Sequence, residues 1–210
     1  MDIREFSPKA LPYHFVLFYD LSPQQMQMYA GIFGGTLFDN ALLTYCYIDR
    51  MAGISFDVIC CALVNHKDGS VKYHMPDRRE TSMKIREGGL ESNAIIVDGD
   101  PYIRFLKYWE DEIKRYYGYH QELISINPDI PFDNLRHPMY PDDVFVFFFD
   151  QAGRVERMWV REVSRENGTI VGILLDEPFN RDLFLHKGDV VQIEAYVREE
   201  DGAVMPIWRR

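Results

Sequence analysis

The sequence is poor in the features that mark exported and membrane-spanning proteins. It has three cysteines in 210 residues, Cys46, Cys60 and Cys61, and adjacent strand residues such as the last two point to opposite faces, so they do not form an ordinary disulfide. The longest apolar run, Val58 to Val64, is far shorter than the roughly 18 residues of a membrane-spanning helix. The first twenty residues contain no signal-peptide core. We therefore expect a cytoplasmic protein with free thiols and no membrane association.

Basic residues are also scarce. Lys and Arg number 23 against 33 Asp and Glu, which gives a net charge of −10. A chain this acidic repels phosphate backbones, so we expect no nucleic-acid partner. Hydrophobic residues make up 47% of the chain and charged residues 27%, which is typical of a folded globular protein. The length allows one large domain or two small ones.

The spacing of reactive residues indicates neither a metal site nor a catalytic group. The six histidines show neither the i,i+4 spacing of a helical metal site nor the alternate spacing of a strand site; they are His14, His66, His74, His120, His137 and His186. Cys60 and Cys61 lie inside an apolar run, where a thiol has a raised pKa and fills the core. Asp98 and Asp100 flank Gly99, which we interpret as a turn followed by a helix cap. We expect no cofactor, no metal and no catalytic residue.

The first half of the chain alternates strand and helix patterns. Ser22, Pro23 and Gln25 form a capping-box signature that begins a helix over 23–33. A second helix, 101–117, is predicted after a cap at Asp100. Strands are predicted at 13–19, 42–49, 56–66, 71–75 and 93–97. The Asp68–Gly69 turn predicts a hairpin in which Leu63 faces His74. The charged segment 77–92 has no clear assignment.

The second half predicts strands alone. Four prolines between 119 and 143 indicate a wrapping loop or linker. Strands are predicted at 144–149, 154–163, 169–175 and 190–197. The expected fold is therefore α+β: an N-terminal antiparallel sheet with two or more helices over 1–125, a Pro-rich linker over 126–143, and a small C-terminal antiparallel β-sheet or barrel over 144–210.

One stretch of the second half resembles a known family. It comprises Met158-Trp159-Val160, then Gly172-Ile173-Leu174 leading to Asp176-Glu177-Pro178, then Gly188-Asp189 before the last predicted strand. This region, about 154–196, resembles an uncharacterised family of small bacterial β-domains, some of whose relatives are linked to toxin-immunity loci. The resemblance implies a binding role and carries over no catalytic residue.

The alternating residues Arg157, Trp159 and Arg161 share one face of a predicted strand, and Met158 and Val160 share the other. Arg and Trp are enriched in interface hot spots, so an outward stripe of this kind is a candidate partner-binding face. The simpler interpretation, which the sequence favours, is that Trp159 lies in the core with the arginines extended beside it.

Two functions follow as hypotheses. The first is a non-enzymatic protein-binding or immunity-type module. The alternative is a small hydrolase or ligand-sensing enzyme with a site between the domains, built from dispersed residues such as Asp142, Glu177 and His186. We interpret Asp142, Asp143 and Asp150 as charged gatekeepers that flank an aggregation-prone strand. The sequence does not indicate the oligomeric state.

Overall fold

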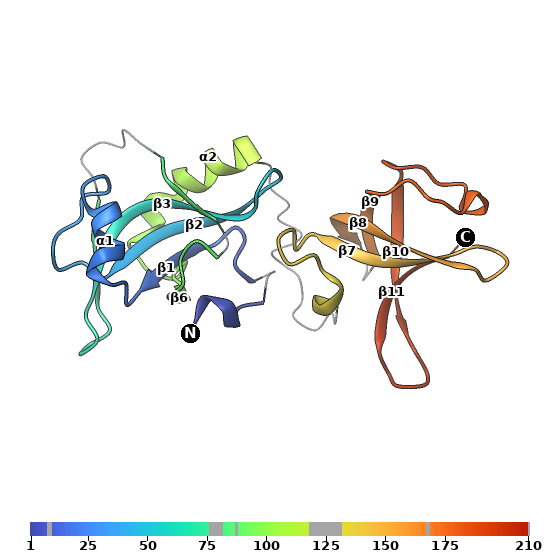
Figure 1. Cartoon of the computed structure of the whole chain (residues 1–210), viewed down its shortest axis with the longest axis horizontal. Coiled ribbons are helices and arrows are strands. Elements are labelled where there is room, and N and C mark those ends of the chain that lie inside the picture. Colours follow the sequence, from blue (N-terminus) through green and yellow to red (C-terminus); the bar gives the residue numbers. More distant parts are fainter. Residues whose placement is uncertain (8–9, 76–81, 87, 118–131, 167–168, 210) are drawn as a thin grey trace. The chain divides into compact units, whose positions relative to one another are not determined.

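The structure, a computed structural model, describes residues 1–7, 10–75, 82–86, 88–117, 132–166 and 169–209 (Figure 1). The chain divides into two units, Met1–Tyr119 and His120–Arg210, which we call the sheet unit and the barrel unit. Within the expected linker, residues 126–131 lie outside the described residues, and 132–143 belong to the barrel unit. The expected α+β fold is confirmed: an antiparallel sheet with two helices precedes a β-barrel.

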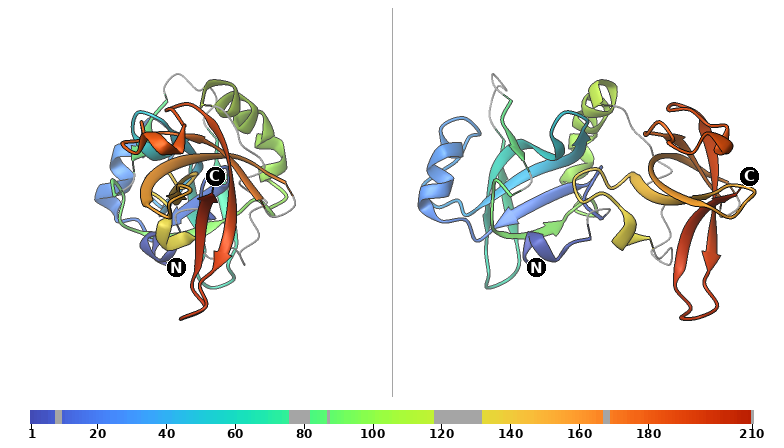
Figure 2. Two further views of the ribbon diagram at one scale, coloured as in Figure 1. Left: turned by 90° about the vertical axis from the view of Figure 1, so that its right-hand side faces the viewer. Right: turned by 45° about the vertical axis from the view of Figure 1, so that its right-hand side comes forward.

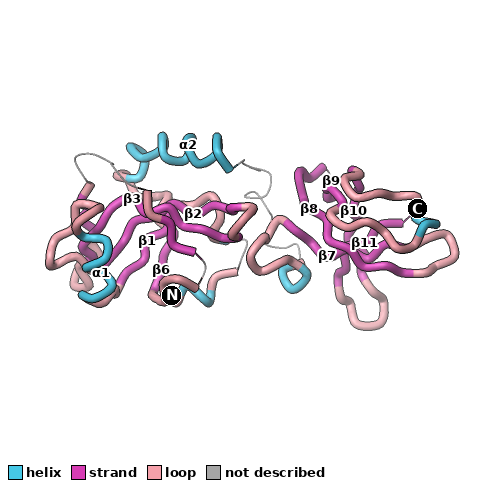
Figure 3. The backbone as a smooth tube through the Cα atoms, turned by 45° about the horizontal axis from the view of Figure 1, so that its top comes forward, coloured by secondary structure: helices cyan, strands magenta, loops and turns pink. Residues whose placement is uncertain are grey.

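The sheet unit is built on a six-stranded antiparallel sheet (Figure 3). The strand order is β4-β3-β2-β1-β6, and β5 pairs with β3 beside this path. The strands are β1 (Phe15–Tyr19), β2 (Ala41–Asp49), β3 (Gly53–Val64), β4 (Val71–His74), β5 (Lys84–Arg86) and β6 (Asn93–Ile96). Every residue of β2 is buried, which explains why this part of the sequence shows no alternation of polar and apolar residues.

Helix α1 (Pro23–Ala30) covers one face of this sheet. The predicted capping box is present: the Ser22 hydroxyl accepts the Gln25 N–H, and the Gln25 side chain accepts the Ser22 N–H. The helix ends at Ala30, three residues earlier than predicted, and a left-handed Gly34 then turns the chain. Met26 and Tyr29 pack in a core with alternate strand residues, among them Val16, Phe18, Phe56 and Val58.

Helix α2 (Lys107–Tyr117) contacts the other face. A 3₁₀ turn, η3 (Ile103–Leu106), precedes it, so the predicted helix 101–117 is α-helical only in its second part. Trp109 Nε1 donates to Asp57 Oδ2 at 3.3 Å, and the Tyr117 ring lies 4.4 Å from that of Tyr47. Among the described residues, neither helix has the length and apolar character needed to cross a bilayer.

The β3–β4 hairpin forms with a register that differs from the prediction. His74 lies opposite Cys61, whereas the sequence placed it opposite Leu63. The reason is a longer loop: the Asn65 N–H donates to Ser70 O and the Gly69 N–H to Asn65 O, so six residues form the turn. The predicted Asp68–Gly69 turn is present, but the strand pairing begins with Val64 opposite Val71, so the register is shifted by two residues along β3.

The barrel unit is a five-stranded closed barrel in the order β10-β11-β7-β8-β9 (Figure 2). Its strands are β7 (Asp143–Phe149), β8 (Val155–Glu166), β9 (Thr169–Leu174), β10 (Val190–Val197) and β11 (Val204–Arg209). Neighbours along the chain pair antiparallel, and β11 then pairs parallel with β7. A meander with an odd number of strands brings its first and last strands together in the same direction, so the barrel is mixed rather than purely antiparallel.

The interior of the barrel is apolar except at one ion pair. Phe148, Met158, Val160 and Leu174 fill it with neighbouring aliphatic residues. Glu162 also points inward from β8, and its carboxylate accepts from Arg136 Nη2 at 3.0 Å. Phe132 belongs to the same core. The described part of the Pro-rich segment is therefore anchored in the barrel by an apolar side chain and a buried charge.

Candidate functional site

The orientation of β8 decides between the two interpretations of Trp159. Met158 and Val160 are 2% and 1% exposed and lie in the barrel core. Arg157, Trp159 and Arg161 therefore point outward, and the interpretation that the sequence favoured is wrong. The tryptophan that packs against the core is Trp208, whose ring lies 5.5 Å from that of Phe148. The inward side chains of Met158, Val160 and Glu162 decide which face of β8 is buried.

Trp159 is half-buried on this outer surface because aromatic rings flank it. Its ring centroid lies 4.8 Å from that of Phe145 and 5.3 Å from that of His137. Its backbone N–H donates to Asp176 Oδ2 at 2.7 Å. The indole is therefore held in place while one side stays accessible, which suits a side chain that docks a partner.

Three arginines on this outer surface, Arg157, Arg161 and Arg209, differ in their partners. The Arg161 guanidinium contacts Asp143 Oδ1 at 3.1 Å. Arg157 lies with its guanidinium carbon 5.9 Å from the Phe145 ring centroid, and Arg209 lies 5.1 Å from the ring of Tyr196. Within the part of the chain that the structure describes, Arg157 and Arg209 have no carboxylate partner. The guanidinium groups of these two arginines thus lie beside aromatic rings.

We call this surface the arginine–aromatic face. It comprises alternate outward residues of three adjacent strands, and its members are Phe145, Phe147 and Phe149 of β7, Arg157, Trp159 and Arg161 of β8, and Arg209 of β11. The three phenylalanines are half-buried, which leaves part of each ring at the surface.

A loop beside β8 extends this face. Asp176, at the start of this loop, accepts the Trp159 N–H. Further along the loop, the Phe179 and Asn180 N–H groups donate to the two carboxylate oxygens of Glu156 on β8, both at 2.9 Å. The Asn180 amide donates to Asp150 Oδ2 at 2.9 Å. The loop is thus fixed by three carboxylates of the same unit, although Phe179 itself is 95% exposed.

A shallow groove of about 610 Å³ lies between this loop and the start of β8. It is lined by Arg154, Val155, Glu156, Phe179, Asn180, Arg181 and Asp182. Val155 is 54% exposed and belongs to the same outward row of β8 as Arg157. The groove and the arginine–aromatic face are therefore continuous through β8.

The residues of the hydrolase hypothesis are only partly brought together. The carboxylate of Glu177 lies 3.0 Å from His186 Nδ1, and its other oxygen accepts the Lys187 N–H. This backbone N–H, followed by the histidine, lowers the pKa of Glu177. Asp142 is 1% exposed and lies among buried residues, whereas the side chains of Glu177 and His186 are 47% and 71% exposed. The structure joins two of the three residues.

The gatekeeper interpretation of the acidic residues around β7 is also wrong. Asp142, Asp143 and Asp150 are 1%, 6% and 6% exposed, so they do not form a charged rim in solvent. Asp143 pairs with Arg161, and Asp150 accepts from Arg154 and the loop. Asp143 and Asp150 are structural acceptors, and two of their partners, Arg161 and Asn180, are distant along the chain, so the sequence does not reveal these contacts.

A cysteine, a histidine and an aspartate meet in the sheet unit without forming a reactive thiol. Cys61 lies opposite His74, whose Nδ1 is 3.0 Å from the Asp39 carboxylate. Burial raises the pKa of Cys61 to about 12, and the nearby Asp39 charge acts in the same direction. Burial likewise raises the pKa of Cys60. The prediction that both thiols fill the core is confirmed.

Among the described residues, no group of three or more His, Cys, Asp or Glu side chains is arranged to hold a metal ion. Comparison of the chain with known protein families, with curated proteins and with solved structures gives no match.

Proposed function

We propose that this protein is a protein-binding module whose barrel unit recognises an acidic segment of a partner protein. The observation that carries the proposal is the pair of arginines without carboxylate partners among the described residues, Arg157 and Arg209, held over aromatic rings. The chain has 33 acidic residues against 23 basic ones, so carboxylates are plentiful. Arginines that remain unneutralised in such a chain are available to an external carboxylate.

The aromatic residues give this surface the composition of a binding hot spot. Trp, Tyr and Arg dominate the binding energy of protein interfaces. The rings of Trp and Tyr also lose little conformational entropy on binding. Trp159 is already fixed by Phe145, His137 and the Asp176 carboxylate. Because the side chain is ordered before a partner arrives, less free energy is lost on association.

Phe179 supplies an apolar anchor beside the charged stripe. A side chain that is 95% exposed gains nothing from the barrel core, yet Glu156 and Asp150 fix the loop that presents it. A partner that buries this ring gains hydrophobic free energy without first ordering the loop. We infer that the partner offers an apolar pocket next to carboxylates.

The proposed partner is a protein rather than a nucleic acid. A net charge of −10 disfavours approach to a phosphate backbone, whereas two local arginines suffice to pair with one or two carboxylates. An immunity-type role, in which this face holds a toxin, is one form of the proposal and is supported by the resemblance of 154–196. Free, buried thiols are compatible with action in the cytoplasm.

Site-specific photocrosslinking tests the proposal. A photoreactive phenylalanine analogue is placed at Phe179 or Val155, and in a control at Val190, which is 68% exposed on β10 outside the groove. Each variant is expressed in cells of the source organism and irradiated. We expect one protein to be crosslinked from Phe179 and Val155 and not from Val190, and Arg157→Glu to abolish that product.

The outcomes are distinguishable. A partner whose crosslinked peptide is acidic supports the proposal. Crosslinks to nucleic acid, equal crosslinking from Val190, or a product that survives Arg157→Glu and Trp159→Ala together would each overturn it. Circular dichroism of every variant establishes that loss of the product does not reflect unfolding.

A further inference from the structure

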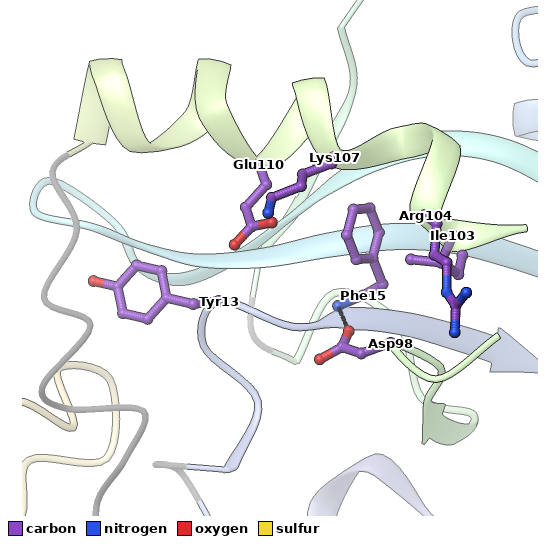
Figure 4. A pocket seen from close by; sticks show the side chains of 7 residues that line it. All are labelled: Tyr13, Phe15, Asp98, Ile103, Arg104, Lys107 and Glu110. Carbon is purple, nitrogen blue, oxygen red and sulfur yellow. Dashed lines mark hydrogen bonds between the residues drawn. The ribbon is translucent and has the colours of Figure 1, made fainter. Parts of the chain in front are cut away.

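The sheet unit contains a cavity of about 240 Å³ beside α2 (Figure 4). It is lined by Tyr13, Phe15, Asp98, Ile103, Arg104, Lys107 and Glu110. Figure 4 shows that Tyr13 lies on the chain leading into β1, that Phe15 begins this strand, and that Arg104 and Lys107 come from the helical segment above it. Phe15, Tyr13 and Ile103 are 5%, 7% and 3% exposed, so the apolar part of the wall is set by core packing.

Both carboxylates that line this cavity are already engaged. Asp98 Oδ1 accepts the Phe15 N–H at 2.7 Å, and Asp98 Oδ2 is paired with His14 Nδ1. Glu110 is paired with Lys114 one turn further along the helix. Each carboxylate is therefore held by a partner of the sheet unit: Asp98 by hydrogen bonds and Glu110 by an ion pair.

The two cations of the wall are not compensated in the same way. Within the described residues, neither Arg104 nor Lys107 forms an ion pair or a side-chain hydrogen bond. They lie three residues apart, which places them on neighbouring positions of the helical surface. The cavity thus combines an apolar wall with two carboxylates that have partners and two cations that have no ion-pair partner among the described residues.

We propose that this cavity binds a small organic anion with an apolar body, such as an aryl or short alkyl carboxylate. The apolar body lies against Phe15 and Ile103, and the anionic group is placed between Lys107 and Arg104. The cavity has the volume of about eight water molecules, so the ligand is about the size of a benzoate ion and much smaller than a dinucleotide. This site is independent of the proposed protein-binding face.

Titration with three matched probes tests the site. Benzoate, benzyl alcohol and benzylammonium share a ring and differ in charge. In ¹⁵N-resolved NMR spectra we expect benzoate to shift the amides of Tyr13, Phe15 and Ile103, with a dissociation constant of about a millimolar. Lys107→Gln and Arg104→Gln should each weaken benzoate binding by about tenfold. Arg115→Gln, an exposed cation of the same helix outside the cavity, is the control and should leave binding unchanged.

Three results would overturn the proposal: shifts by benzylammonium at least as large as those by benzoate, benzoate shifts confined to other parts of the chain, or equal binding by all three helix variants. Both substituted cations are exposed, so their removal does not disturb the core. The probes and the amides differ from those of the crosslinking experiment, so either proposal can fail alone.

Discussion

Arg136 and Glu162 form a buried ion pair in the barrel unit, with side chains that are 2% and 0% exposed and a nitrogen–oxygen distance of 3.0 Å. A second nitrogen of the same guanidinium donates to Pro141 O at 2.6 Å. The pair links the segment before β7 to the inward face of β8. Removing one member leaves the other charge buried without a partner, which is strongly destabilising.

We predict that Arg136→Met lowers the free energy of unfolding of the barrel unit by about 3–5 kcal/mol. The double variant Arg136→Met, Glu162→Leu should recover most of this loss, because no buried charge remains. Urea unfolding followed by fluorine NMR of fluorotryptophan-labelled protein separates the units, since Trp159 and Trp208 report on the barrel and Trp109 on the sheet. A single variant as stable as the double one would contradict the prediction.

The sequence does not predict this ion pair, whereas it does predict contacts between residues close along the chain. The start of α1 follows from Ser22, Pro23 and Gln25, which interact within one turn, and such local signals are readable from a single sequence. Arg136 and Glu162 are 26 residues apart, and nothing in either neighbourhood specifies the other. Loop fixation by Glu156 escaped prediction for the same reason.

Strand β11 escaped prediction for a different reason. Pro206 interrupts its pattern, and a proline argues against a strand with neighbours on both sides. In the structure Pro206 pairs with Ala195 of β10, but the parallel pairing with β7 begins only at Ile207. The proline therefore lies where β11 has one neighbour, and barrel closure needs only the last three residues of the strand.

Two glycines at the end of α1 should respond oppositely to alanine. A Cβ at Gly35 would lie 2.6 Å from Ala30 Cα and 2.8 Å from Cys61 Sγ, so Gly35→Ala should destabilise the sheet unit by about 1–3 kcal/mol. At Gly31 the space is open and the backbone is right-handed helical, so Gly31→Ala should be neutral or stabilise by up to about 1 kcal/mol. Thermal unfolding of both variants measures the difference, and equal effects would show that the close approach is relieved by backbone movement.

The three thiols should be unreactive in the folded protein. Burial raises the pKa of Cys61 to about 12 and also raises that of Cys60, so at about pH 8 neither supplies thiolate. A chromogenic disulfide reagent should label none of the thiols in buffer and all three in guanidinium chloride. Rapid labelling of one thiol under native conditions would show that this cysteine is not buried. If that thiol were Cys61, a reactive cysteine beside His74 and Asp39 would again be a hypothesis.

Asp150 should make the barrel unit sensitive to acid. Hydrogen bonds from the Asn180 amide and then from Arg154 lower the pKa of this carboxyl from 3.8 to about 2. Its contribution is therefore complete above the unfolded-state value of 3.8 and is lost as the pH falls through about 2, because the protonated carboxyl no longer accepts these bonds. Asp150→Asn should lower the urea midpoint at about pH 6, and its difference from the unmodified protein should shrink toward about pH 2. Glu199→Gln, at an exposed carboxylate, is the control and should show no such convergence.

The fixation of Phe179 by Glu156 can be measured directly. Both carboxylate oxygens accept a backbone N–H, so Glu156→Gln replaces one acceptor with an amide donor that opposes an N–H group. We expect faster hydrogen exchange at the amides of Phe179 and Asn180 and unchanged exchange after Glu194→Gln, at an exposed position of β10. In this variant the loop would have to become ordered when the partner binds, which costs conformational entropy. Glu156→Gln should therefore also weaken binding of the partner, although it leaves the Phe179 ring in place. Phe179→Ser separates the two effects: it removes the ring and should leave the exchange of the Asn180 amide slow. Unchanged exchange in Glu156→Gln would mean that the loop is held by Asp176 and Asp150 alone.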